Sequence, residues 1–374
     1  MRYRLLFCGK ALLISTLLLS AIGAVMVYSA SLPLAQGQYQ DGYFFLRRHL
    51  IRLGLGLLAM LCTWWIVRSR RINLRYFAYP LTLISLALLW AVLYSPLGVK
   101  IRGAQRWLSF RGFLFQPVEL AKLGLVFCLA HLAAKSQERE DKGLYFLGLA
   151  GGMMSAVLFF VVRQPDLGNT LLLGSITFIF FFLARVHLVY LLSLGLIAVS
   201  TAGLWLTRYP YVQKRLAAFI DPWQHAADGG FQTVQSYLAL GNGGLWGLGL
   251  GAGRQKWGYL PEAYSDFILA VIGEELGLIG AGLVIIGFFI LIWAGFKIAA
   301  ASADLFTGYL CAGIISIIGL QAFLNIWVVI GLFPNKGLPL PFISYGGTSL
   351  VANLIGIGIL LAYATEKTGL RPEA

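Results

Sequence analysis

The chain has 374 residues, of which 59% are hydrophobic and only 12% are charged. A soluble domain averages about 25% charged residues, so half of the usual solvating charge is missing. Apolar runs of about 17–25 residues recur from end to end, each long enough to cross a bilayer. With a mean hydropathy of +0.79, the composition excludes a soluble enzyme. It predicts an all-α polytopic membrane protein that forms a single domain over residues 1–374.

The apolar runs predict about ten transmembrane helices. The first run is longer than the apolar core of a cleaved signal sequence, which is usually about 7–15 residues. An even number of spans puts both termini on one side, and the short basic connectors 68–75 and 135–143 indicate that this side is the cytoplasm. The predicted spans are 11–30, 49–67, 74–94, 115–134, 144–162, 169–184, 187–207, 262–295, 304–330 and 342–364.

The basic residues divide evenly between the two predicted sides, although topology signals usually deplete the outer side of them. Two interpretations are open for the outer cations. They bind an anionic ligand at the outer leaflet, such as a phosphate-bearing lipid, or they extend from span ends toward lipid headgroups in general.

A long outer loop is predicted between helices 7 and 8, over residues 208–261. Connectors of this length in compact folds are usually functional or disordered. Its core, GNGGLWGLGLGAGRQKWG, contains eight glycines. Either its N–H groups surround a lipid headgroup, or its glycines allow close packing against neighbouring helices.

Three carboxylates in the stretch GYLPEAYSDFILAVIGEELG stand out, because carboxylates are costly where no water solvates them. Pro261 and Glu262 predict a helix N-terminus. Asp266 would then lie in the second turn near the outer interface, either stabilised by the helix dipole or acting as a general base. Glu274 and Glu275 lie deeper and are expected to pair or hydrogen bond between helices.

Three further polar clusters lie at the outer ends of predicted spans. The segment 98–124 combines several cations with a tryptophan and an acid–base pair at i, i+3, which is often a local ion pair. A tight turn at 161–170 carries another cation, and the segment 331–349 has a lysine among helix breakers, which are tolerated at membrane depth only where they line protein or a cavity. Together with Asp266, the clusters predict one outward-opening cavity. The key side chains are Arg106, Trp107, Glu119, Lys122, Arg163 and Lys336.

No metal site is predicted. The four cysteines lie in different apolar segments without a CxxC pair, and the four histidines are scattered along the chain. Signatures of zinc proteases, serine hydrolases, P-loop enzymes and kinases are absent from the sequence.

Several motifs together resemble the SEDS family (shape, elongation, division and sporulation), which contains the FtsW, RodA and SpoVE proteins. The resemblance covers nearly the whole chain. It rests on GAQRWL with QPVELAK, QPDLG, DPW with GFQTVQS, GNGGLWGLGLG, YLPEAYSDFI with GEELG, and KGLPLPFISYGGTS. KRLAAFIDPW and LPEA look closer to the FtsW and SpoVE branch than to RodA.

The resemblance implies a peptidoglycan glycosyltransferase that polymerises lipid II outside the bacterial cytoplasmic membrane. By the same resemblance Asp266 matches the catalytic aspartate. The implied partners are lipid II, the lipid-linked glycan strand, membrane lipids and a class B penicillin-binding protein acting as transpeptidase, with no nucleic acid. The cofactor is left open, with a divalent cation at the pyrophosphate as one possibility. The matching substrate-binding residues are Arg106, Trp107, Glu119, Lys122 and Lys336, with Arg48 and Arg163 as weaker candidates.

The chain departs from the family pattern at a few positions. Val118 stands where serine is usual, and Asn242 where a second serine is common. Tyr264 and Ser265 replace a common His–Thr pair, which puts the surroundings of Asp266 in question.

Two alternatives to a glycosyltransferase remain from the sequence. A transporter of the same lipid also needs a cavity with a cationic rim, but transporters usually show internal repeats and broken helices near the midplane, and no repeat is visible here. A non-catalytic scaffold for a transpeptidase is the other alternative.

Overall fold

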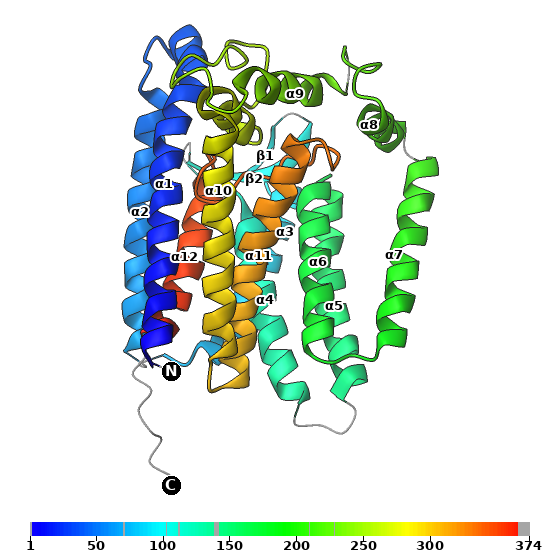
Figure 1. Cartoon of the computed structure of the whole chain (residues 1–374). Helices are drawn as coiled ribbons and strands as arrows, with labels where there is room; N and C mark the ends of the chain where they lie inside the picture. Colours follow the sequence, from blue (N-terminus) through cyan, green and yellow to red (C-terminus); the bar gives the residue numbers. More distant parts are fainter. Residues whose placement is uncertain are drawn as a thin grey trace.

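The computed structural model is an elongated helical bundle, with smaller elements gathered at one end (Figure 1). The residues that the structure describes are 2–69, 72–101, 103–110, 113–137, 142–208, 210–227 and 229–365. The helices are α1 (Arg2–Tyr39), α2 (Phe44–Arg68), α3 (Ala78–Tyr94), α4 (Pro117–Ser136), α5 (Lys142–Arg163), α6 (Leu167–Leu183), α7 (Leu188–Arg208), α8 (Pro210–Ile220), α9 (Phe231–Gly243), α10 (Ile268–Ala300), α11 (Leu305–Val329) and α12 (Gly347–Ala364), with a 3₁₀ turn η1 (Leu74–Phe77) before α3.

Within the described residues, eight helices are long and apolar enough to cross a membrane. This confirms the predicted multi-pass helical class. Two shorter apolar segments, Leu167–Leu183 and Leu188–Ile197, coincide with the predicted sixth and seventh spans. The count of ten spans, and the long loop between the seventh and eighth, therefore stay predictions.

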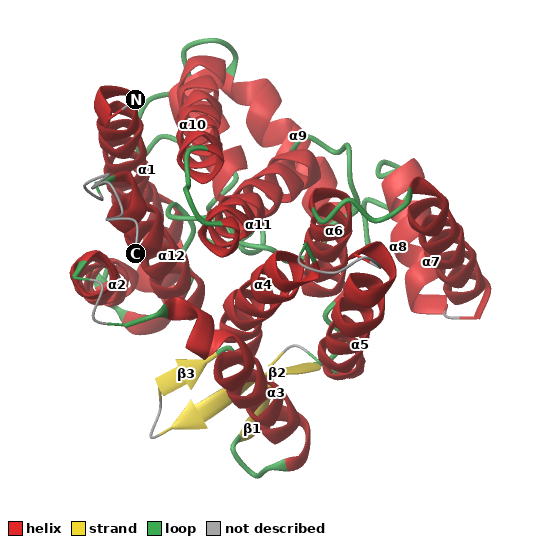
Figure 2. Cartoon of the chain, turned by 90° about the horizontal axis from the view of Figure 1, so that it is seen from below, coloured by secondary structure: helices red, strands yellow, loops and turns green. Residues whose placement is uncertain are grey.

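The helices α4 and α11 lie at the centre of the bundle when it is viewed along its long axis (Figure 2). In the most apolar window of each, 89% of α4 and 78% of α11 is buried, against 17% of α2. The peripheral helices therefore present apolar side chains outward, as expected where lipid is the solvent. Glu119 and Lys122 of α4, and Gln321 and Asn325 of α11, are polar side chains enclosed by protein.

Close packing at the α2–α12 contact depends on glycines. A Cβ at Gly56 of α2 would lie 2.5 Å from Leu354 Cδ1, and one at Gly358 of α12 would lie 2.5 Å from the Met60 carbonyl oxygen. Because association in lipid gains little from the hydrophobic effect, small residues that allow backbones to approach are the usual means of helix contact.

A three-stranded antiparallel sheet joins α3 to α4, a small addition to the predicted all-α fold that the sequence analysis did not anticipate. Its strands are β1 (Gly98–Ile101), β2 (Ala104–Phe110) and β3 (Phe113–Phe115), with Val99 opposite Trp107 and Leu108 opposite Phe115. Alternating apolar and polar residues between two Arg-Gly pairs are typical of short strands joined by turns. Gly103, at the first turn, has φ +83°, a conformation that favours glycine.

The small elements cover one end of the bundle. Figure 1 shows α8 and α9 lying across the same end as the sheet and the first turns of α10. The start of α1 and the end of α12 are at the opposite end, where the last turns of α10 also lie. Polar groups contributed by distant parts of the sequence can therefore meet where α10 begins.

The start of α10 differs from the prediction. The helix begins at Ile268 rather than at Pro261, and Glu262 has φ +59°, which is incompatible with a first helical turn. Asp266 therefore lies two residues before the helix and not in its second turn. Pro261 was a misleading signal, because proline suits turns as well as the first position of a helix.

The helix α10 is interrupted at Gly277, where φ is +69° and ψ is −171°. The segment 243–249 replaces the missing helical bonds. Leu248 and Gly249 donate their N–H groups to the carbonyls of Glu274 and Glu275 (3.0 Å each), while Leu278 and Ile279 donate to the carbonyls of residues 244 and 245 (2.9 and 3.3 Å). The backbone is thus hydrogen bonded across the break, as burial requires.

Candidate active site

Asp266 lies in the series of turns 259–267 that precedes α10. This segment packs against the connector from α11 to α12, residues 330–346. Its side chain is half-buried. One carboxylate oxygen, Oδ1, accepts a hydrogen bond from the Ser265 hydroxyl (3.2 Å). The other, Oδ2, faces Gly337, where a Cβ atom would lie 3.3 Å away. The replacement of the common His–Thr pair thus leaves a hydroxyl donor next to the carboxylate.

Backbone contacts fix the Asp266 segment against this connector. Buried Asn325 of α11 donates from its amide to the carbonyls of Asp266 and Leu338, both at 2.7 Å. The Ser344 hydroxyl donates to the Ser265 carbonyl (2.6 Å), and the Tyr345 N–H donates to the Tyr264 carbonyl (3.0 Å). Two segments about 75 residues apart in sequence are therefore held in register by bonds that do not use the carboxylate.

The turn before α6 lies beside the connector and binds the side chain of Arg106 from β2. Gly168 is so close to the connector that a Cβ atom would lie 2.6 Å from the Lys336 carbonyl oxygen. The buried Asp166 caps α6 by accepting from the Asn169 N–H and side-chain amide (3.2 and 2.8 Å). Arg106 of β2 approaches Asp166 Oδ2 at 3.7 Å and donates to the carbonyls of Gln164 and Pro165. The predicted clusters at 98–124, 161–170 and 331–349 thus meet.

Glu119 and Lys122 form the predicted i, i+3 ion pair (2.7 Å), and both side chains are only 2% exposed. The Lys122 ammonium also donates to Gln321 Oε1 of α11 (2.9 Å), and the Gln321 amide donates to the Pro339 carbonyl (2.8 Å). A chain of polar contacts therefore runs from α4 through α11 to the connector. Direct contact of Lys122 with a substrate stays a prediction.

The other candidate residues have different surroundings. Trp107 is half-buried on β2 opposite Val99. Arg48 and Arg163 are exposed, and each guanidinium lies over a ring of its own helix, 4.1 Å from the Phe44 centroid and 4.9 Å from the Phe159 centroid. Their role toward a substrate stays a prediction.

Two further cations, which the sequence analysis did not identify, contact the connector. Arg52 of α2 lies over the Tyr345 ring (4.9 Å to its centroid) and beside Gly347. Arg215 of α8 donates to the Asn335 carbonyl (3.1 Å). Arg52 lies one helical turn beyond Arg48, so that spacing was a readable signal; the position of Arg215 depends on how α8 folds over the bundle.

Two polar residues in the core of α11, Gln321 and Asn325, were also missed as site residues. They lie four residues apart on one face of an apolar helix. Polar groups within a membrane span usually mark a functional site, so this signal was present in the sequence.

The pKa of Lys336 is lowered below its ordinary value, first because burial disfavours the charged ammonium and second because the positive charge of Arg215 is nearby. The Lys336 ammonium lies 5.4 Å from the centroid of the Phe333 ring. A desolvated lysine next to another cation is a favourable place for an added negative charge, which would relieve both effects.

Glu274 and Glu275 have no solvent exposure, and the predicted bonding between helices is found for Glu275, whereas the partners of Glu274 lie in the loop 254–255. Glu274 accepts from the N–H groups of Arg254 (2.9 Å) and Gln255 (3.2 and 3.3 Å). Glu275 pairs with buried Lys256 (2.7 Å), and it accepts from the Ser29 hydroxyl of α1 and from the Gly251 N–H.

These carboxylates also explain the glycine-rich loop. N–H groups of residues 251, 254 and 255 are directed at carboxylates of α10. A Cβ at Gly243 would lie 1.9 Å from the Gly273 carbonyl oxygen. Of the two interpretations of this loop, close packing against neighbouring helices describes these contacts.

Within the part of the chain that the structure describes, no group of three or more His, Cys, Asp or Glu side chains is placed to hold a metal ion. A divalent cation at the pyrophosphate, one possibility that the sequence analysis left open, is untested.

The fold and the site define an integral membrane protein with a half-buried carboxylate beside a connector approached by several cations. The sequence matches the family described as cell cycle protein, FtsW/RodA/SpoVE, over residues 10–369. The chain belongs to this family.

Its relatives are named for a specific activity. The chain is 40% identical over 363 residues to a probable peptidoglycan glycosyltransferase FtsW of Geobacter sulfurreducens, covering 96% of this chain and 95% of the relative. It is 38% identical over 351 residues to stage V sporulation protein E of Bacillus subtilis, covering 94% and 95%. These matches agree with the predicted FtsW and SpoVE branch and confirm the predicted enzyme class, a glycosyltransferase.

Two solved structures share the fold. One is a chain from a study of a peptidoglycan synthase complex that coordinates polymerization and crosslinking, with a TM-score of 0.75 and 29% identity over 94% of this chain and 96% of that chain. The other is the rod shape determining protein RodA of Thermus thermophilus, with a TM-score of 0.68 and 28% identity over 94% and 95%.

Proposed function

We propose that this protein polymerises lipid II into peptidoglycan glycan strands at the outer face of the bacterial cytoplasmic membrane. The names of its relatives support the reaction class. The observation that carries the proposal is the Asp266 carboxylate, half-buried and turned toward Gly337, next to Lys336. The proposal places the end of the bundle with α8, α9 and the sheet at the outer face of the membrane and both termini in the cytoplasm.

The proposed reaction is a single displacement. A hydroxyl of one lipid-linked sugar attacks the anomeric carbon of the other, the new glycosidic bond forms, and the bond to the lipid pyrophosphate breaks. Asp266 takes the proton from the attacking hydroxyl, since a positioned base contributes about 10²–10⁴-fold. With one carboxylate acting and no second one required as nucleophile, inversion at the anomeric carbon is expected by analogy with glycosidases.

The departing pyrophosphate needs cations. We assign this role first to Lys336, whose lowered pKa reflects burial beside another cation. Arg106 is next, because its guanidinium lies at the turn that contacts the Lys336 carbonyl. Positive groups placed where negative charge develops lower the barrier most when little reorganisation is needed. Trp107, Arg48 and Arg163 are candidates for binding the rest of the lipid-linked sugar.

We propose that Glu119 and Lys122 contribute by positioning the connector. Their buried pair connects through Gln321 to the Pro339 carbonyl, three residues from Lys336. A shift of about 1 Å in a reacting group costs of the order of 10²-fold in rate. The buried Glu119–Lys122 pair would therefore aid the reaction by keeping the connector in place.

A transpeptidase that crosslinks the new strands is the proposed partner, in line with the synthase complex whose chain shares this fold. The reaction can be tested with purified protein and lipid II in detergent, with and without such a partner. Glycan strands resolved by gel electrophoresis are the expected product. Because transport has no meaning without a membrane barrier, a flippase would give no polymer in this assay.

A scaffold would also give no polymer on its own. If polymer formed only with the partner and was unaffected by Asp266→Asn, the proposal would be replaced by a scaffold role. Failure to form any polymer, alone or with the partner, would contradict the proposed reaction.

A further inference from the structure

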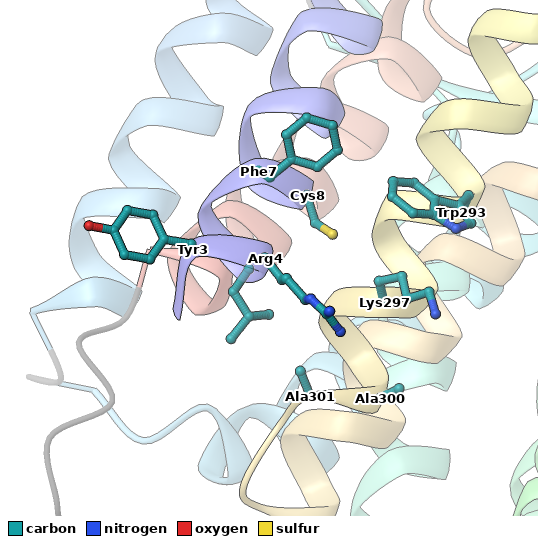
Figure 3. Close-up of a pocket in the computed structure, with 9 residues that line it drawn as sticks. Tyr3, Arg4, Phe7, Cys8, Trp293, Lys297, Ala300 and Ala301 are labelled. Carbon is teal, nitrogen blue, oxygen red and sulfur yellow. The ribbon is translucent and has the colours of Figure 1, made fainter. Parts of the chain in front are cut away.

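A second feature lies at the opposite end of the molecule from Asp266. The first turns of α1 and the last turns of α10 border a groove of about 610 Å³ (Figure 3). Arg4, Phe7 and Cys8 come from α1, whereas Trp293 and Lys297 come from α10. These helices are about 290 residues apart in sequence but lie side by side in the bundle (Figure 1).

Two cationic side chains border the groove. Arg4 and Lys297 are both exposed, and the Arg4 side chain extends from α1 toward α10 (Figure 3). Among the described residues, neither forms an ion pair with a carboxylate. The nearest acid along the chain from Lys297, Asp304, is bonded to Arg75. The N-terminus of the long helix α1 adds a positive dipole end.

Apolar surface lies directly beside these charges. The exposed rings of Phe7 and Trp293 meet edge to face, with 6.5 Å between their centroids. Further along the same helices, Ile14 of α1 and Phe289 of α10 are exposed as well. A free phosphate would use only the charged end of such a groove. A molecule with an anionic head and an acyl chain would use both.

We propose that this groove binds one anionic phospholipid, with its phosphate between Arg4 and Lys297 and an acyl chain against Phe7 and Trp293. The site is independent of the proposed reaction, because it lies at the other end of α10. A bound lipid would connect the start of α1 to the end of the helix that follows Asp266.

Trp293 provides a local probe. The full chain is reconstituted into vesicles of phosphatidylglycerol and phosphatidylcholine in a fixed ratio, with bromine on the acyl chains of one lipid or of the other. Surface charge is then identical in both samples, and only the position of the quencher differs. The Trp293 emission is obtained by subtracting the Trp293→Phe variant. We expect stronger quenching when the label is on phosphatidylglycerol.

The double variant Arg4→Gln/Lys297→Gln tests the charges. Each surface cation removed is expected to lower the preference for phosphatidylglycerol by roughly fivefold. Lys10→Gln, an exposed change of the same charge on α1 outside the groove, is the matched control and should keep the preference. Trp90, which is exposed on α3, should show no preference in its own subtraction with Trp90→Phe.

Three results would overturn the proposal. Equal quenching of Trp293 by the two labelled lipids would show that the groove does not select an anionic lipid. A protein partner would then replace the lipid as the proposed occupant. An unchanged preference in the double variant would remove Arg4 and Lys297 from the site. An equal loss in Lys10→Gln would show a general surface effect rather than a groove.

Discussion

Three carboxylates near the start of α10, eight or nine residues apart, have different surroundings. Glu274 and Glu275 are fully buried, and backbone N–H groups, a hydroxyl and an ammonium satisfy their oxygens. Asp266 is half-buried, and its Oδ2 lies on the side of exposed Gly337, where a Cβ atom would be 3.3 Å away. The backbone around Asp266 is held by hydrogen bonds from Asn325 and Ser344.

This difference separates two acids with a structural role from the proposed general base. A carboxylate whose lone pairs are already used by fixed donors holds a loop in place, but it has little capacity left to accept a substrate proton. A carboxylate that is fixed through its backbone and accessible through its side chain retains that capacity. All three side chains are carboxylates, and the groups around each one determine the role we assign to it.

The largest expected effect is on Asp266. Asp266→Asn keeps the size and polarity of the side chain but removes the base, so we expect polymerisation to fall by about 10²–10⁴-fold. Thermal unfolding in detergent should be almost unchanged. Glu274→Gln is the control for loss of a nearby carboxylate, and it should act on stability. A variant Asp266→Asn with full activity would remove the base from the mechanism.

Glu275 is expected to affect stability strongly. Glu275→Gln keeps an acceptor for the Gly251 N–H but leaves the buried Lys256 ammonium without its counter-charge, which costs about 3–5 kcal/mol. Adding Lys256→Met should recover most of the lost stability, as measured by thermal unfolding. If the single and double variants were equally unstable, the ion pair would not be the cause.

Gly337 tests the accessible side of Asp266. Ala at this position must adopt φ +63°, and its Cβ would lie 3.3 Å from Asp266 Oδ2. We expect roughly tenfold lower polymerisation, through displacement of the carboxylate. Gly249→Ala is a matched control, since it also has a positive φ (+102°) but open space around its Cβ. It should reduce stability without a comparable loss of activity, and equal activity losses would contradict the role of Gly337.

The smallest effect concerns pH. The lowered pKa of Lys336 means that the free enzyme loses this ammonium at a lower pH than an ordinary lysine would. Activity that needs the charge is present below this pKa and is lost as pH rises through it, so kcat/KM should decline on the alkaline side. Arg215→Gln removes a neighbouring cation, raises the pKa of Lys336 and should move the decline to higher pH.

A second variant checks the assignment of that decline. Lys336→Arg, whose guanidinium stays protonated, should abolish this part of the profile if it remains active. A decline that was unaltered in both variants would assign it to another group.

Most helices were predictable because a membrane span must satisfy its own backbone, so apolar length alone reveals it. The sheet at 98–115 was missed because its cations suggested a binding loop, whereas the alternation around Trp107 was readable as strands. The start of α10 was misplaced because Pro261 and Glu262 imitate a helix N-terminus; the positive φ of Glu262 depends on tertiary contacts.

The candidate site was predictable in part. Its carboxylate and cations were visible as separate clusters, and the Glu119–Lys122 pair followed from i, i+3 spacing. The partners of Glu275 were not predictable, since Ser29 is 246 residues away. The contact between Gly337 and Asp266 depends on how the connector folds, so the sequence did not reveal it. The sequence also did not reveal that the Arg48 guanidinium lies over the Phe44 ring of its own helix.

The interruption at Gly277 makes α10 two mechanical units. The 243–249 segment is hydrogen bonded to Glu274 and Glu275 before the break and to Leu278 and Ile279 after it, and the later portion runs on through the bundle. A force that tilted the later portion in the bilayer would therefore act on the 243–249 segment as well as on Gly277.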